Sequence, residues 1–127
     1  MDNDRSSLIT IGGEQYRLIL TTRATKEIAR RYGGLENLGS KLMKSENFEM
    51  ALDEIVWLIT LLANQGILID NRINQEKKPL LTEEDVELLT SPLDLAGYKD
   101  AITEAMLKGT KRYIESEEPV SKNVQVG

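Results

Sequence analysis

The sequence has no cysteine and no histidine among its 127 residues. Their absence excludes disulfide bonds, thiolate catalysis, Ser-His and Cys-His dyads and nearly all zinc chemistry. It also removes the only side chain whose unperturbed pKa lies near neutrality, so an acid–base enzyme would need a carboxylate or lysine with a strongly shifted pKa. We therefore predict that the chain is not an enzyme and holds no metal ion and no cofactor.

Aromatic residues are also scarce, at 5 % of the chain, whereas 40 % of the residues are hydrophobic. The core of one domain of this length must then consist mainly of Leu, Ile, Val, Ala and Met. Residues 55–63 are apolar apart from Thr60, and these nine positions are far fewer than the ~20 that a membrane helix needs. The net charge of -5 disfavours contact with nucleic acid and with anionic membranes. We expect a soluble cytoplasmic protein that binds neither.

Residues 8–20 have the pattern of a β-hairpin, because apolar residues alternate on both sides of Gly12 and Gly13. A two-residue turn at these glycines pairs Ile9 with Tyr16. It places five apolar residues on one face: Ile9, Ile11, Tyr16, Leu18 and Leu20. A three-residue turn would put the apolar sets of the two strands on opposite faces. An isolated hairpin is only marginally stable, so the apolar face must pack on helices.

The remaining pattern predicts helices separated by capping residues and glycines. The first predicted helix is capped by Thr21 or Thr22 and ends at Gly33, and a short second helix carries Leu35, Leu38 and Leu42. A central helix runs from about residue 47 to 65 and is stopped by Gly66. A short acidic helix at 83–89 is capped by Thr82, and a last helix begins at Ser91 and Pro92 and ends at Gly109. The predicted fold class is therefore mainly α. Residues 8–113 form a single small domain of about five to six helices with an N-terminal β-hairpin. Residues 1–7 and 114–127 are predicted to be a disordered N-terminus and a disordered C-terminal tail.

The central helix has apolar residues on more than one side. Trp57, Leu58 and Leu61 lie away from the main apolar arc, which consists of Leu52, Ile55, Val56, Ile59, Leu62 and Ala63. Two interpretations are open. Either the helix is the centre of the core and its neighbours wrap it, or the three residues form a second face for a homo-oligomer or for a partner helix.

Two charged clusters complete the candidate sites. Arg23, Lys26 and Arg30 line one face of the first helix, which is either a solvated face or a site for an acidic partner protein; interleaved aromatic residues for base stacking are missing. The acidic run at residues 83–87 lacks the spacing of a calcium loop, and the positive end of a helix dipole accounts for it. Neither cluster predicts nucleic-acid or metal binding.

Several stretches together resemble the tail assembly chaperones of long-tailed phages and Gram-positive prophages. They are ITIGGEQY at residues 9–16 leading into IARRYGGL at 28–35, then ALDEIVWL at 51–58, then LLTSP at 88–92 with AITEAM at 101–106. The likeness covers about residues 8–113. It is a pattern of hydrophobic residues and turns in order and spacing, without a catalytic signature.

The resemblance implies a non-enzymatic protein of the host cytoplasm that binds the tape measure protein and promotes assembly of tail tube protein around it. Such chaperones are absent from the mature virion, and the family has no catalytic residues. The alternative is a small structural or adaptor component of the phage tail or head–tail junction, which stays in the particle. A DNA-binding regulator would show salt-dependent DNA binding, and we expect none.

Overall fold

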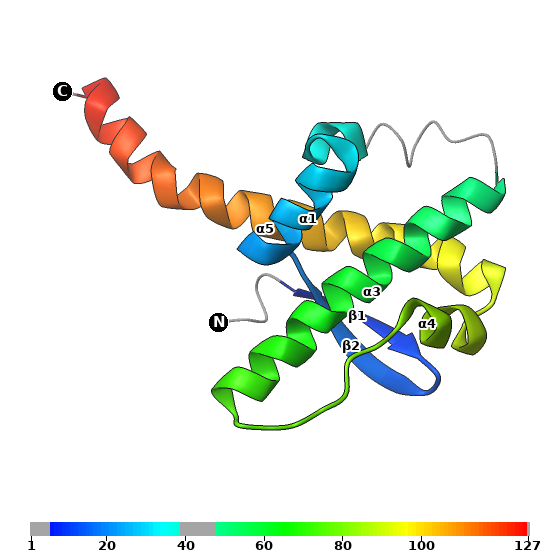
Figure 1. The fold of residues 1–127 in the computed structure, drawn as a ribbon. Coiled ribbons are helices and arrows are strands. Elements are labelled where there is room, and N and C mark those ends of the chain that lie inside the picture. Colours follow the sequence, from blue (N-terminus) through cyan, green and yellow to red (C-terminus); the bar gives the residue numbers. More distant parts are fainter. Residues whose placement is uncertain (1–5, 39–47, 127) are drawn as a thin grey trace.

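The computed structural model describes the backbone of residues 6–38 and 48–126 and the side chains of residues 6–38 and 52–110. It is one small, mainly helical domain, with 68 % helix and an N-terminal antiparallel hairpin, which confirms the predicted fold class. The elements in chain order are β1 (Ser6–Ile11), β2 (Glu14–Ile19), α1 (Thr22–Tyr32), α3 (Phe48–Ile73), α4 (Glu83–Leu89) and α5 (Pro92–Val126) (Figure 1). Residues 35–38 are also helical. Predictions for residues 1–5, Leu42 and Gly127 lie outside the described residues.

The hairpin has the predicted register, with Ile9 opposite Tyr16 and Ile11 opposite Glu14. Gly12 and Gly13 have φ angles of 59° and 86°, and the two-residue turn that matches strand twist needs positive φ at both positions. The predicted apolar face is buried, apart from the half-buried Tyr16. The local pattern therefore set the register correctly.

Strand β1 begins at Ser6, so Ser6 and Ser7, which were predicted to be disordered, belong to the strand. Ser6 and Ser7 are 6 % and 4 % exposed, although both are polar. Their polar groups have partners on α5: the Ser7 hydroxyl donates a hydrogen bond to the Ala101 carbonyl at 2.7 Å, and the Lys108 ammonium donates to the Ser6 carbonyl at 2.8 Å. Contacts distant in the sequence, which no local pattern reveals, therefore extend the strand.

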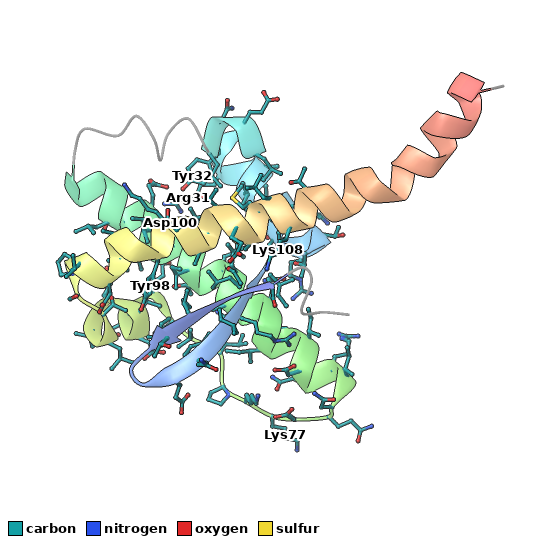
Figure 2. All side chains as sticks on the ribbon, turned by 180° about the vertical axis from the view of Figure 1, so that it is seen from behind. Arg31, Tyr32, Lys77, Tyr98, Asp100 and Lys108 are labelled. Carbon is teal, nitrogen blue, oxygen red and sulfur yellow. The ribbon has the colours of Figure 1, made fainter. Side chains whose placement is uncertain are left out.

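Helices pack against both strands. Helix α3 packs mainly on β2 and α5 mainly on β1; α3 crosses the hairpin in Figure 1, and α5 crosses it on the near side in the reverse view of Figure 2. On β1, the Tyr98 hydroxyl donates to the Thr10 carbonyl. An uncovered strand edge invites pairing with another chain. Here α5 side chains bond to the Ser6 and Thr10 carbonyls of β1, and the α3 backbone at Gly66 lies against the Arg17 carbonyl of β2.

Gly66 and Gly109 do not end helices, contrary to the prediction: α3 continues to Ile73 and α5 to Val126. A Cβ atom on Gly66 would lie 2.8 Å from the Arg17 carbonyl oxygen, and one on Gly109 would lie 2.9 Å from Leu20 Cβ. Glycine is required at both places because the helix backbones approach the hairpin too closely for any side chain. The continuation of α5 also makes residues 114–126 helical, where the sequence predicted a disordered tail.

The predicted caps are confirmed. Thr21 accepts a hydrogen bond from the Ala24 amide at 3.0 Å, and Gly33 ends α1 in the left-handed conformation at φ 86°. Thr82 and Asp85 form a capping box at α4. Ser91 and Asp94 exchange the same pair of side-chain-to-backbone bonds at α5, at 3.2 and 3.0 Å. The core lies where α3, the hairpin and α5 meet, and its fully buried residues include Leu18, Ile59, Leu62 and Ile102.

The role of Gly66 can be tested by substitution. We expect Gly66→Ala to lower the free energy of unfolding by about 1–3 kcal/mol, because the added methyl overpacks the contact with the Arg17 carbonyl. Gly97→Ala is the matched control on α5, where nothing lies within 4 Å of the added Cβ. We expect it to raise the free energy of unfolding by about 0.5–1 kcal/mol through helix propensity. Urea denaturation of both variants measures the difference, and equal effects would contradict the close approach.

Candidate protein-binding surfaces

Trp57 lies where the end of α1 meets α3. The Arg31 guanidinium stacks over the indole ring, 4.4 Å from its centroid, and the Tyr32 ring meets it edge-on at 6.0 Å. Figure 2 labels Arg31 and Tyr32 at this end of α1. Glu54, which is 8 % exposed, accepts a hydrogen bond from the Tyr32 hydroxyl, and its Oε1 lies 3.4 Å from Arg31 Nε. Contacts among Arg31, Tyr32, Glu54 and Trp57 therefore hold α1 against α3. Side chains of α1 already cover part of the Trp57 indole.

The structure does not leave Trp57, Leu58 and Leu61 as an open face. Leu58 is fully buried, and Trp57 and Leu61 are half-buried and pack against the core. The reason is that the hairpin, α4 and α5 all pack on α3, so the central helix is wrapped on several sides. Leu58 is therefore not accessible to a partner in this structure.

Residues Leu52–Ile73 of α3 are long and apolar enough to cross a membrane, judged by length and composition alone. The sequence count stopped at nine positions, whereas the helix continues through Gly66. A buried core helix meets the same two criteria, and 56 % of the most apolar window of this segment is buried inside the protein. We therefore interpret α3 as a core helix.

The predicted basic residues Arg23, Lys26 and Arg30 are exposed on α1. Arg30 pairs with Glu27 at 2.8 Å. Arg23 lines a hollow of about 650 Å³ that also touches the later turns of α3, and Lys26 lines one of about 410 Å³ that also touches Gly109 on α5. None of the large exposed apolar side chains among the described residues lies on α1. This face can attract an acidic segment, and apolar side chains such as Leu68 and Leu35 take part in lining the two hollows beside it.

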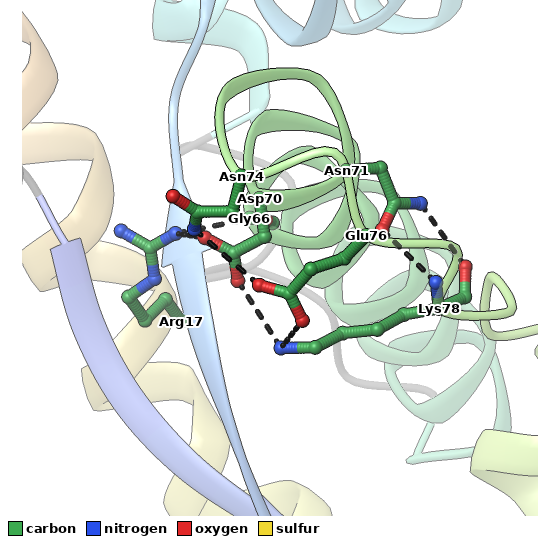
Figure 3. Close-up of polar contacts among 7 residues, drawn as sticks. All are labelled: Arg17, Gly66, Asp70, Asn71, Asn74, Glu76 and Lys78. Carbon is green, nitrogen blue, oxygen red and sulfur yellow. Dashed lines mark hydrogen bonds and ion pairs between the residues drawn. The ribbon is translucent and has the colours of Figure 1, made fainter.

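A polar cluster joins β2, α3 and the segment after α3 (Figure 3). Asp70 Oδ1 lies 2.6 Å from Arg17 Nη2, and Asp70 Oδ2 lies 3.5 Å from Lys78 Nζ. Glu76 also pairs with Lys78, at 3.4 Å. Because Arg17 and Asp70 are each only about a quarter exposed, their pair contributes more than a typical surface ion pair. The cluster fixes the segment against the helix.

Asn64 and Asn71 hold the same segment by its backbone. The Asn64 side chain makes two hydrogen bonds with the main chain of Leu81, at 2.8 and 2.9 Å, and Asn71 makes two with Lys78, at 3.0 and 3.1 Å. Seven helical residues span ~10.5 Å, and three extended residues span ~10 Å, so the two pairs match in spacing. The segment thereby delivers α4 to a fixed position on α3.

Three of the strongly exposed leucines among the described residues lie on α4 and on the first turn of α5. These two elements lie beside the hairpin turn in Figure 1. Leu88, Leu89 and Leu93 are 74 %, 53 % and 83 % exposed. Leu89 Cδ1 lies 3.3 Å from the position of a Cβ on Gly12, so this leucine touches the turn. Val86 is the residue by which α4 enters the core. We call Leu88, Leu89 and Leu93 the leucine corner.

The sequence-based reasoning missed the leucine corner. It treated residues 83–89 as a helix explained by its dipole and did not ask which side its leucines face. A helix of seven residues has room for one buried face, and Val86 occupies it. The signal was therefore present as an apolar pair, Leu88 and Leu89, at the end of an acidic helix too short to bury both.

No group of three or more acidic residues within the described part of the chain is arranged to hold a metal ion.

Burial, followed by the hydrogen bond to Glu14, raises the pKa of Tyr16 above its usual 10.0. Burial, followed by the charge of Asp94, raises the pKa of Tyr98 in the same direction. Both tyrosines lie near acidic residues that surround the leucine corner.

Comparison with known proteins adds no relative: no protein-family model, no curated protein and no solved structure matches this chain. The resemblance to tail assembly chaperones therefore stays a prediction.

The contact between α1 and α3 yields a stability prediction. We expect Glu54→Ala to lower the free energy of unfolding by about 2–3 kcal/mol, because it removes the buried partner of Tyr32 and Arg31. Asp53→Ala, at the exposed neighbouring position, is the control and should stay within about 0.5 kcal/mol. Chemical denaturation measures both, and a Glu54→Ala variant as stable as Asp53→Ala would show that the carboxylate is dispensable.

The raised tyrosine pKa values predict a loss of stability at alkaline pH. The phenol of Tyr16 stays protonated longer in the folded chain than in the unfolded one, whose pKa is 10.0. Its contribution is therefore fully present below pH 10 and disappears as the pH rises through the native pKa. We expect native tyrosinate absorbance to rise at higher pH than in urea, with a smaller difference for Tyr16→Phe. Superimposable native and unfolded titrations would contradict this.

Proposed function

We propose that this chain is a phage tail assembly chaperone, a non-enzymatic protein that binds the tape measure protein while the tail tube assembles around it. The observation that supports the proposal best is the leucine corner, three strongly exposed leucines on a small acidic domain. Contiguous exposed apolar surface on a small domain is typical of protein-binding sites. The order of hairpin, glycines and helices on which the family resemblance depends supplies the identity of the partner.

The physical demands of such a role agree with these features. A protein that keeps a long helical client soluble needs apolar contact surface together with surplus charge of one sign. This chain carries both, with a net charge of -5 and exposed leucines on helices. The leucines of the corner lie on helices, and a client helix packs on such surfaces through side chains.

The proposed function can be tested by co-expression. The chain is produced together with the tape measure protein encoded in the same phage or prophage genome, and the soluble fraction is analysed after affinity purification of the chain. We expect the tape measure protein to be soluble and to co-purify. An unrelated acidic protein of similar size, produced in the same way, is the control. Equal solubility of the tape measure protein with the control would contradict the proposal.

A structural or adaptor component of the tail or head–tail junction is the second candidate. It uses the same kind of exposed apolar surface but keeps its partner in the finished particle. Mass spectrometry of purified virions separates the two functions. A chaperone is absent from the particle, whereas an adaptor is present in constant proportion to the tail proteins.

A further inference from the structure

We propose that the leucine corner binds a basic amphipathic helix of another protein, with its leucines against the apolar face of that helix and its acidic rim against the lysines and arginines. The inference rests on the proposed function in one respect only, namely that the chain binds proteins. It adds the surface and the chemistry of the partner.

The apolar part of the surface is concentrated. Seven large apolar side chains are strongly exposed among the described residues, and four of them lie between residues 80 and 93: Leu80, Leu88, Leu89 and Leu93. The other three are scattered over β1, the end of α3 and α5, at Leu8, Ile73 and Leu107. Single exposed leucines are ordinary, whereas a cluster on adjoining helix ends is typical of a contact site.

Charge is concentrated at the same place. Residues 80–98 contain five acidic residues and no basic one: Glu83, Glu84, Asp85, Glu87 and Asp94. The rest of the chain holds 16 acidic and 16 basic residues, so this segment accounts for the whole net charge of -5. Glu84 and Leu88 stand four residues apart on α4 and share one face. The leucines therefore lie in the part of the sequence where negative charge is unbalanced.

Lys77, Lys78 and Lys99 flank this segment in the sequence. Among the described residues, however, none of the five carboxylates forms an ion pair, and Lys78 pairs with Asp70 and Glu76 instead. The hairpin turn that touches Leu89 is followed directly by Glu14, another acid. Burial is the main cause of the raised pKa values of Tyr16 and Tyr98, and the charges of Asp85 and Asp94 raise them further. A partner with positive charge beside apolar residues would be attracted at a distance and would gain apolar burial on contact.

A helix with both features fits better than the other occupants. Anionic membranes and nucleic acid carry the same sign of charge as the corner. A second copy of this chain offers the basic face of α1, but the exposed residues there, Arg23, Lys26 and Arg30, bring no large apolar side chain to meet the leucines. The observations therefore favour a basic amphipathic helix on a different protein.

Binding of a model helix tests the proposal directly. The probe is a fluorescein-labelled peptide of leucine and lysine, roughly five helical turns long, with the leucines on one face. Its counterpart has glutamate in place of every lysine. Fluorescence anisotropy with the full chain measures affinity at low and at physiological salt. We expect the basic peptide to bind and the acidic peptide to bind at least tenfold more weakly, with the difference shrinking as salt rises.

Matched variants locate the site. We expect Leu88→Ser with Leu93→Ser to weaken binding of the basic peptide by about tenfold or more, because contacts at the centre of an interface carry most of its affinity. Leu8→Ser with Leu107→Ser removes two leucines of similar exposure elsewhere and should change affinity less than about twofold.

Charge variants test the acidic rim. Glu84→Gln with Glu87→Gln should weaken binding and reduce its salt dependence. Glu36→Gln with Asp53→Asn, at exposed positions outside the corner, should do neither. Circular dichroism confirms that each variant is folded.

Several outcomes would overturn the proposal. Equal losses in the two leucine pairs would show unspecific apolar binding, and equal affinity for both peptides would show that charge plays no part. Sedimentation of the chain alone is the remaining measurement. An oligomer that dissociates in Leu88→Ser with Leu93→Ser would show that a second copy covers the corner. If the peptide does not bind but the tape measure protein still co-purifies, only this inference fails. If the peptide binds but the tape measure protein does not co-purify, only the proposed function fails.

Discussion

Helices α3 and α5 each reach the hairpin at a glycine, and the arrangement of the other elements depends on these two contacts. At Gly66 the backbone of α3 comes within reach of the Arg17 carbonyl, and at Gly109 the backbone of α5 comes against Leu20. A methyl group at either place would push the helix away from the strand by a distance that a packed core does not absorb. The hairpin is only two strands wide, so its stability depends on that proximity.

The same proximity covers part of the sheet's edges. Because the helices lie against both strands, side chains of α5 satisfy outward carbonyls of β1, as Tyr98 does for Thr10 and Lys108 for Ser6. An open two-stranded ribbon would offer its edges as a template for further strands. With these positions covered, helix surfaces and the turn make up much of what a partner can contact. This is consistent with the leucine corner, which adjoins the turn and is formed by two helix ends.

The features that the sequence predicted correctly are those set by neighbours in the chain. The register of the hairpin follows from alternation around Gly12 and Gly13, and the caps at Thr21 and Thr82 follow from side chains that bond to amides three residues on. Gly66 and Gly109 were wrongly predicted to end helices. A glycine that ends a helix has the same local sequence pattern as a glycine that lets a neighbouring chain segment pack closely on the helix backbone. Only the position of Arg17 or Leu20 distinguishes them, and each lies tens of residues away in sequence.

The candidate surfaces divide in the same way. Helical periodicity placed Arg23, Lys26 and Arg30 correctly on an exposed face, because a helix packed on one side leaves its charged stripe in solvent. For the central helix it left two interpretations open, and the burial of Leu58 agrees with the one in which neighbouring elements wrap the helix.

The leucine corner arises from the opposite condition. Helix α4 is short, enters the core through Val86 and is held in place by the Asn64 and Asn71 bonds to the segment before it. Its remaining leucines therefore stay in solvent among carboxylates and add no burial to the stability of the domain on its own. Contact with a partner of opposite charge would take their apolar surface out of water.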